Sequence, residues 1–157
     1  MKILVLESSG LVASVAVVTE EKLIGEYTTN FKKTHSQTLL PMMDTLLKMI
    51  GIPVQEMDAI AVSGGPGSFT GLRIGSATAK GLGLALSIPI ISVPTVDAIA
   101  YNLCGTDAVV CPLMDARRNQ TYTGRYTFDG DQMKCISGQK AVMLGEIIDE
   151  INQLGRK

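Results

Sequence analysis

A glycine-rich segment at residues 63–75, SGGPGSFTGLRIG, has the composition of a phosphate-binding loop. It follows a short apolar run and precedes a helical pattern, which is the order of elements in many nucleotide-binding units. At the start of such a helix, free backbone N–H groups and the helix dipole favour an anion. The first question is therefore whether the loop has the residues that hold a phosphate.

The segment matches neither common template for phosphate-binding loops. The P-loop requires Gly, four further residues and then Gly-Lys-Ser/Thr, but Pro66 takes the first glycine position and Leu72 follows Gly71. The dinucleotide-binding pattern Gly-x-Gly-x-x-Gly fails at Thr70. Two interpretations remain: a weak anion site, or a tight strand-to-helix turn capped by Ser68 or Thr70. We favour the tight turn.

The helix after this loop has a small residue at every fourth position: Gly71, Gly75, Ala79 and Gly83. Residues four apart share one helix face, so another backbone can approach this stripe closely. Glycine inside a helix costs about 1 kcal/mol relative to alanine, and close packing would compensate for that cost. The stripe packs either on the chain's own sheet or on a partner's helix.

An earlier helical pattern adds soft apolar residues that suit an adaptable interface. Such residues are more often core, so both alternatives stay open here as well. The candidate interface residues on the two helices are Leu39, Met42, Met43, Leu46, Gly71, Gly75, Ala79 and Gly83.

Titratable side chains provide few candidates for catalysis. His35 is the single histidine, and neither a triad with Ser36 nor an oxyanion arrangement is evident around it. Glu7 and Asp115 end two apolar runs and resemble the carboxylates that position magnesium and water in phosphotransferases. We predict no catalytic residue, no cofactor and no metal ion.

Composition excludes several classes of protein. The net charge of −1, from 14 basic and 15 acidic residues, gives no general affinity for nucleic acid or an anionic membrane. No apolar run approaches the roughly 20 residues that span a bilayer. Cys104, Cys111 and Cys135 are odd in number and lack CxxC spacing, which indicates reduced thiols. We expect a cytoplasmic protein.

Hydrophobic periodicity predicts the element order β-β-β-α-β-α-β-α, followed by a second β-β-β-α series. Pro41 falls near the start of the first helix, so we expect that helix to begin late or to be kinked. The first series has strands at 2–7, 13–19, 23–29, 59–63 and 89–93 and helices at 39–50, 69–86 and 95–103. The second has strands at 108–115, 120–128 and 134–139 and a helix at 141–154.

This order indicates a duplicated α/β lobe, with Glu7 and Asp115 in equivalent places and the second copy lacking its last strands and helices. We predict a first domain at residues 1–103, which carries the candidate interface helices, and a partial second domain at 104–157. A βββαβαβα lobe in two copies is the RNase H-like plan of the actin, Hsp70 and sugar-kinase superfamily.

Four segments carry a closer resemblance: LVLESS, HSQTLLPMMDTLL, SGGPGSFTGLRIG and MDARRNQTY. In them, and over essentially the whole chain, the sequence resembles the bacterial TsaB (YeaZ) family without its C-terminal part. The resemblance implies a non-catalytic protein that binds TsaD and, with the ATPase TsaE, supports synthesis of threonylcarbamoyladenosine on tRNA. It also implies a homodimer in isolation and contact with tRNA only through the complex.

The family resemblance also identifies where a metal would lie. TsaD holds its metal with an HxxxH motif on the helix after the fifth strand, and Thr95 and Ile99 stand at the matching positions here. Neither side chain is a useful ligand for a transition metal. Two alternatives to a partner protein are an ATP-dependent phosphotransferase of the same superfamily and, less favoured, a metallopeptidase-like protein.

Overall fold

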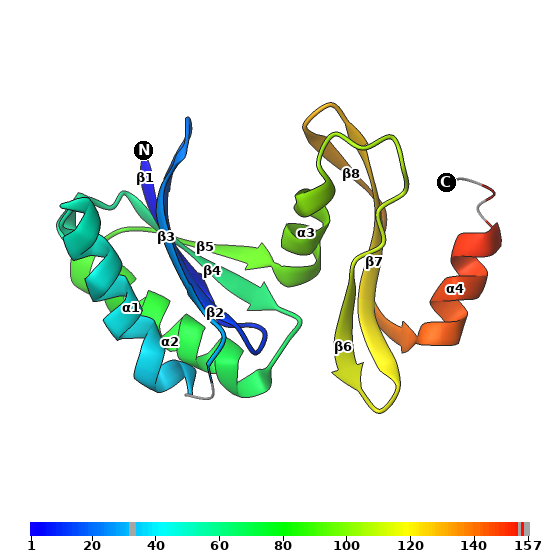
Figure 1. Ribbon diagram of the computed structural model, residues 1–157, viewed down its shortest axis with the longest axis horizontal. Helices are drawn as coiled ribbons and strands as arrows, with labels where there is room; N and C mark the ends of the chain where they lie inside the picture. The colour runs from blue at the N-terminus through cyan, green and yellow to red at the C-terminus, as the bar shows by residue number, and fades with distance from the viewer. Residues whose placement is uncertain (32–33, 154, 156–157) are drawn as a thin grey trace. The chain divides into compact units, whose positions relative to one another are not determined.

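The computed structural model describes residues 1–31, 34–153 and 155 (Figure 1). The chain forms two compact units, Met1–Val93 and Pro94–Lys157. Each unit has its own sheet and its own apolar core. None of the described helices is long and apolar enough to cross a membrane.

The first unit is built on a five-stranded sheet of order β3-β2-β1-β4-β5. β1 pairs antiparallel with β2 and parallel with β4, and β2 pairs antiparallel with β3. The strands are β1 (Lys2–Glu7), β2 (Ala13–Thr19), β3 (Leu23–Thr29), β4 (Ala59–Gly65) and β5 (Ile90–Pro94). The predicted bounds of the first three strands are confirmed.

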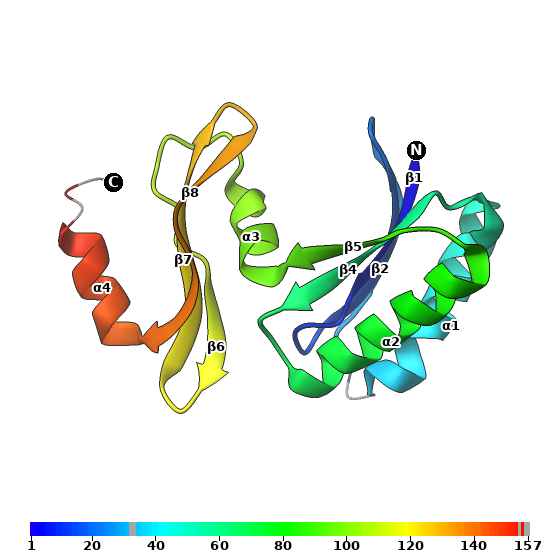
Figure 2. The ribbon, with the colours of Figure 1, turned by 180° about the vertical axis from the view of Figure 1, so that it is seen from behind.

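Two helices cover one face of this sheet, as Figures 1 and 2 show: α1 (His35–Ile50) and α2 (Phe69–Leu86). A short 3-10 helix, η1 (Val54–Glu56), follows α1. Alternate strand residues such as Leu4, Leu6 and Val15 point into the core that these helices close. The bounds of α2 agree with the sequence-based prediction.

The prediction that α1 begins late or is kinked at its first turn is wrong about where the helix starts. The helix begins at His35 and contains Pro41 in its interior. Thr34 precedes it in an extended conformation, and Nε2 of His35 donates to the Gly10 carbonyl oxygen at 2.9 Å. This contact with the turn after β1 fixes the first helical turn, which periodicity alone could not reveal.

The second unit contains a three-stranded antiparallel sheet of order β6-β7-β8. A small core forms around Tyr126, with Val96, Ala100 and Val110. The elements are α3 (Thr95–Ala100), η2 (Tyr101–Leu103), β6 (Leu113–Arg117), β7 (Gln120–Asp129), β8 (Gln132–Met143) and α4 (Leu144–Gln153). The predicted second β-β-β-α series is therefore present.

Several predicted boundaries in this unit are wrong, and β8 (Gln132–Met143) extends beyond both ends of the predicted 134–139. The strand expected at 108–115 begins only at Leu113, because Pro112 has no N–H to donate to a ladder and Val110 forms just an isolated bridge to Tyr126. Residues 141–143, expected in the last helix, instead extend β8. They pair with the first residues of β7, so long-range pairing overrides their local helical pattern.

Helix α3 packs within the second unit rather than the first. Its residues Val96 and Ala100 are buried with Tyr126, and the Tyr126 hydroxyl donates to Asp97 at 2.6 Å. The compact units accordingly divide before α3, whereas the sequence-based domain boundary at 103/104 places the division after it. The domain boundary at 103/104 stays a prediction.

Candidate functional site

The glycine-rich segment packs on the turn between β1 and β2. A Cβ atom at Gly67 would lie 2.5 Å from the Ser9 carbonyl oxygen, and one at Gly71 would lie well inside 3.0 Å of the Ser8 carbonyl oxygen. A Cβ atom at Gly75 would overlap the Ser8 hydroxyl. These glycines are needed because the backbone of one turn lies directly against the loop and the helix that follows it.

Hydrogen bonds tie this turn to three other elements. The Ser8 hydroxyl donates to the Gly71 carbonyl oxygen at 2.9 Å, and the Ser68 N–H donates to the Ser9 carbonyl oxygen at 2.7 Å. The Ser8 N–H lies 3.4 Å from the Ser63 hydroxyl oxygen of β4. The Ser8, Ser9 and Ser63 side chains are buried, so these bonds satisfy polar groups that water does not reach.

The start of α2 is capped by the chain itself. Ser68 precedes the helix, and its hydroxyl oxygen accepts from the Gly71 N–H at 3.3 Å, which confirms one of the two predicted caps. The β1–β2 turn therefore lies against the loop, and one of the first helical N–H groups already has a partner. This arrangement supports the tight-turn interpretation of the loop.

Glu7 and Asp115, which we predicted to occupy equivalent places in the two lobes, each accept a hydrogen bond from the turn that follows them. An oxygen of Glu7 accepts from the Ser9 N–H at 2.5 Å, and an oxygen of Asp115 accepts from the Arg117 N–H at 2.8 Å. In both cases the carboxylate takes the N–H two residues further along. Arg117 and Arg118 are exposed in the turn after Asp115, both at positive φ.

The structure places most of the predicted interface residues inside the first unit. Next to Gly75 lie Ser8 and Val62, and next to Gly83 lies Ile90, so the small-residue stripe faces the chain's own sheet. The buried members are Leu39, Met42, Leu46, Gly71, Gly75, Ala79 and Gly83. Met43 is half-buried. That these helices bind a partner stays a prediction, and the structure changes which residues would carry it.

The exposed apolar residues of α1 and α2 are different ones. Leu40 and Met49 of α1 are 48% and 80% exposed, and Phe69 and Leu84 of α2 are 71% and 84% exposed. We call these four residues, which are grouped by their exposure and not by mutual contact, the α1–α2 surface. The sequence contained a signal for them, because apolar residues occupy more than one face of each helix, but periodicity did not show which face is covered.

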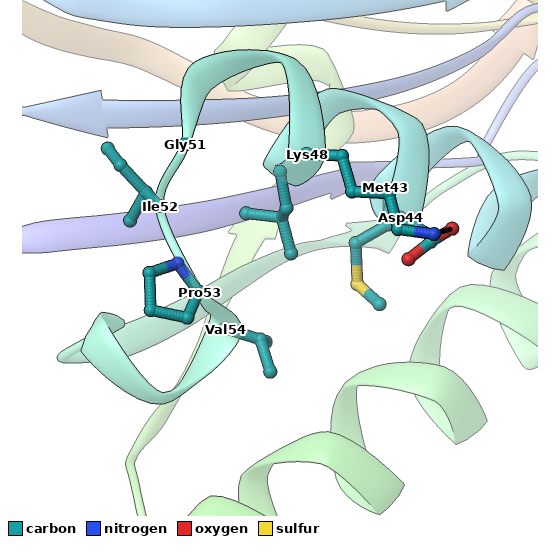
Figure 3. A pocket seen from close by; sticks show the side chains of 8 residues that line it. Met43, Asp44, Lys48, Gly51, Ile52, Pro53 and Val54 are labelled. Carbon is teal, nitrogen blue, oxygen red and sulfur yellow. Dashed lines mark hydrogen bonds and ion pairs between the residues drawn. The ribbon is translucent and has the colours of Figure 1, made fainter.

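A pocket of about 410 Å³ lies at the end of α1 (Figure 3). Its polar edge carries an ion pair in which Lys48 Nζ lies 2.6 Å from Asp44. Met43, the one half-buried member of the predicted interface, contributes a thioether to its wall. The full lining is Met43, Asp44, Leu47, Lys48, Gly51, Ile52, Pro53 and Val54.

The two positions that match the HxxxH motif lie on α3. Thr95 is buried, Ile99 is half-buried, and the Thr95 hydroxyl has no hydrogen-bond partner among the described residues. Across residues 1–31, 34–153 and 155, no group of three His, Cys, Asp or Glu side chains is placed to hold a metal ion. The hydrogen bond from Tyr126 of β7 to Asp97 anchors α3 to the sheet. Burial and this hydrogen bond raise the pKa of Tyr126.

The β-β-β-α-β-α-β order and the β3-β2-β1-β4-β5 sheet define an α/β lobe of the actin, Hsp70 and sugar-kinase class. A family model described as "TsaD: tRNA N6-adenosine threonylcarbamoyltransferase" matches residues 22–156. YeaZ from Pseudomonas aeruginosa superposes with a TM-score of 0.80 at 31% identity, over 90% of this chain and 66% of that one.

Relatives of known name agree with these matches. The tRNA threonylcarbamoyladenosine biosynthesis protein TsaB of Bacillus subtilis is 35% identical over 99% of this chain and 68% of its own length. TsaB of Escherichia coli is 31% identical over 96% of this chain and 65% of its own length. The chain belongs to the TsaB (YeaZ) family, and it spans about two thirds of the length of these two relatives.

Proposed function

We propose that the chain is a non-catalytic partner subunit in the synthesis of threonylcarbamoyladenosine on tRNA. It binds a TsaD-type catalytic subunit, acts with a TsaE-type ATPase and meets tRNA only through the complex. In isolation it forms a homodimer, and it works in the cytoplasm without a cofactor. The names of its TsaB relatives and its match to the TsaD family model support this pathway.

The observation that carries the proposal is the α1–α2 surface. Large apolar side chains that are 48–84% exposed cost free energy in water unless a partner covers them, since burial is worth about 25 cal/mol per Å². The guanidinium of Arg73 lies 4.4 Å from the centre of the Phe69 ring, which adds a charged group beside the apolar side chain. Aromatic and arginine side chains are typical anchors of protein interfaces.

Two features favour a binding role over chemistry. The Ser9 N–H of the β1–β2 turn donates to Glu7, and the Gly71 N–H at the start of α2 donates to Ser68, so neither group is free to bind a phosphate. Thr95 and Ile99 on α3 offer one hydroxyl and no imidazole at the positions of the metal ligands in TsaD. Both features are expected of a subunit whose partner supplies the catalytic residues.

A pull-down with a TsaD-type subunit tests the proposal. We expect wild-type chain to be retained and Leu84→Asp to be lost, because an aspartate buried by the partner would be a desolvated charge. The matched control is Ile136→Asp on β8, since Ile136 is also an exposed apolar residue, at 45%, but lies in the other unit. Equal retention of both variants, with unchanged unfolding, would refute the assigned surface.

A further inference from the structure

The two faces of the second sheet differ in chemistry. Alternate residues of a strand point to opposite faces, and on β7 the residues Tyr122, Tyr126 and Phe128 pack on the side of α3. The intervening residues Thr121, Thr123 and Arg125 point to the other side. Figures 1 and 2 show α4 on that other side of the sheet. The β7 residues on the face beneath α4 are therefore polar, while the pairings place Val142 of β8 and Leu113 of β6 beside them on the same face.

Helix α4 has few attachments to this face. Ile147 is its one buried residue, whereas Leu144 and Ile148 are 48% and 49% exposed. Glu150 supplies ion pairs: Lys140 Nζ of β8 donates to its two oxygens at 2.7 and 2.9 Å, and Arg125 Nη2 of β7 lies at 3.6 Å. In addition, Ile151 is half-buried, and Glu146 accepts from the Met143 N–H at 3.3 Å. Glu150 is thus the residue through which α4 forms ion pairs with the sheet.

A thiol lies beside this ion cluster. Val110 forms an antiparallel bridge with Tyr126, so the next residue, Cys111, is opposite Arg125 and on the same face of the sheet. Cys111 is half-buried, and this burial raises the pKa of its thiol. The buried Nε of Arg125 has no partner among the described side chains and backbone groups. Glu150 of α4 lies near enough to both groups to pair with Arg125 and to raise the pKa of the Cys111 thiol, so lifting α4 would change the surroundings of both.

We propose that α4 is a salt-sensitive cover, which Glu150 holds closed through Lys140 and Arg125 and which exposes Cys111 when it opens. Ion pairs at this depth are partly reached by water, so they are weak and are screened by salt. The apolar contact of Ile147 carries no charge, so the salt that screens the ion pairs does not weaken it. The part of the closing free energy that depends on salt therefore comes from Glu150.

Hydrogen exchange of the α4 backbone in the full chain tests the proposal. We expect Glu150→Gln to lower the protection of α4 amides about fivefold at low salt and to remove most of its salt dependence. Asp149→Asn, at the exposed neighbour on the same helix, is the matched control and should leave protection and its salt dependence unchanged. Ile147→Ala should lower protection but keep the salt dependence, because the ion pairs remain.

A second measurement follows the thiol in a chain with Cys104→Ser and Cys135→Ser, which leaves Cys111 as the remaining cysteine of the three. Its alkylation by neutral iodoacetamide should accelerate with salt in parallel with α4 exchange. The proposal is overturned if Glu150→Gln behaves like Asp149→Asn in hydrogen exchange. It is also overturned if salt opens α4 without any change in Cys111 alkylation.

Discussion

Two glycines of α2 provide a matched pair of substitutions that tests where the small-residue stripe packs. A methyl group at Gly71 would meet the Ser8 carbonyl oxygen well inside 3.0 Å and the His35 ring at 3.1 Å. A methyl group at Gly81, on the exposed side of the same helix, would have no atom within 4 Å among the described residues. The two changes are chemically identical and differ only in what they face.

The expected free energies of unfolding have opposite signs. Alanine stabilises a helix interior by about 1 kcal/mol relative to glycine, so Gly81→Ala should raise stability by about that amount and the Tm by about 2–4 °C. At Gly71 the same gain is offset by overpacking against a backbone atom, which costs about 1–3 kcal/mol, and by loss of the Ser8–Gly71 hydrogen bond, which costs about 1 kcal/mol. Gly71→Ala should therefore lower stability by about 1–3 kcal/mol.

Urea unfolding at several protein concentrations measures both effects. If the stripe packs on the chain's own turn and sheet, the loss in Gly71→Ala is present at every concentration and the slope of the transition is unchanged. Were the stripe instead reserved for a partner helix, Gly71→Ala would be as stable as Gly81→Ala and only association would weaken. That result would refute the packing described for α2.

Three further predictions concern the β1–β2 turn, α3 and nucleotide binding. Gly75→Ala should lower the free energy of unfolding of the wild type, because the new methyl group meets the Ser8 hydroxyl. In a Ser8→Ala background, which lacks that hydroxyl, the same change should cost at least about 0.5 kcal/mol less. If urea unfolding shows that the costs of the two single substitutions simply add in the double variant, the prediction is contradicted. The pKa of Tyr126 is raised from its ordinary 10.0, so the folded state keeps this proton more tightly and loses stability when Tyr126 deprotonates above pH 10. Tyr126→Phe should remove this loss. The difference between the curves of unfolding free energy against pH for the wild type and the variant measures the effect. Calorimetric titration with ATP and magnesium should show no tight one-to-one binding to the isolated chain, and such binding would favour a phosphotransferase.

Local patterns were sufficient to predict much of the first unit. The strands up to residue 29 and the helix Phe69–Leu86 follow from hydrophobic alternation, turn residues and the Ser68 cap. Of the two alternatives predicted for α1, a late start or a kinked first turn, the late start is wrong: the helix begins at His35, whose ring contacts Gly10, a residue distant in sequence. Periodicity identifies the helical segment but does not reveal a distant partner for its first turn.

The rest depended on contacts that no local pattern encodes. Residues 141–143 suit a helix as well as a strand, and their pairing with β7 decides between them. The stripe at Gly71 and Gly75 identifies a face that permits close approach, but not the Ser8 turn that approaches it. For the same reason, the sequence did not separate the buried apolar residues of α1 and α2 from Leu40, Met49, Phe69 and Leu84, which remain exposed.

The most direct test of the proposed partner role is calorimetric titration of the chain with a TsaD-type subunit. We predict saturable one-to-one binding for the wild type and at least about a tenfold higher Kd for Met49→Asp, because the carboxylate would be buried at the interface. Met49 is 80% exposed in the chain alone, so its replacement should leave the free energy of unfolding unchanged. Absence of binding by the folded wild-type chain would contradict the account.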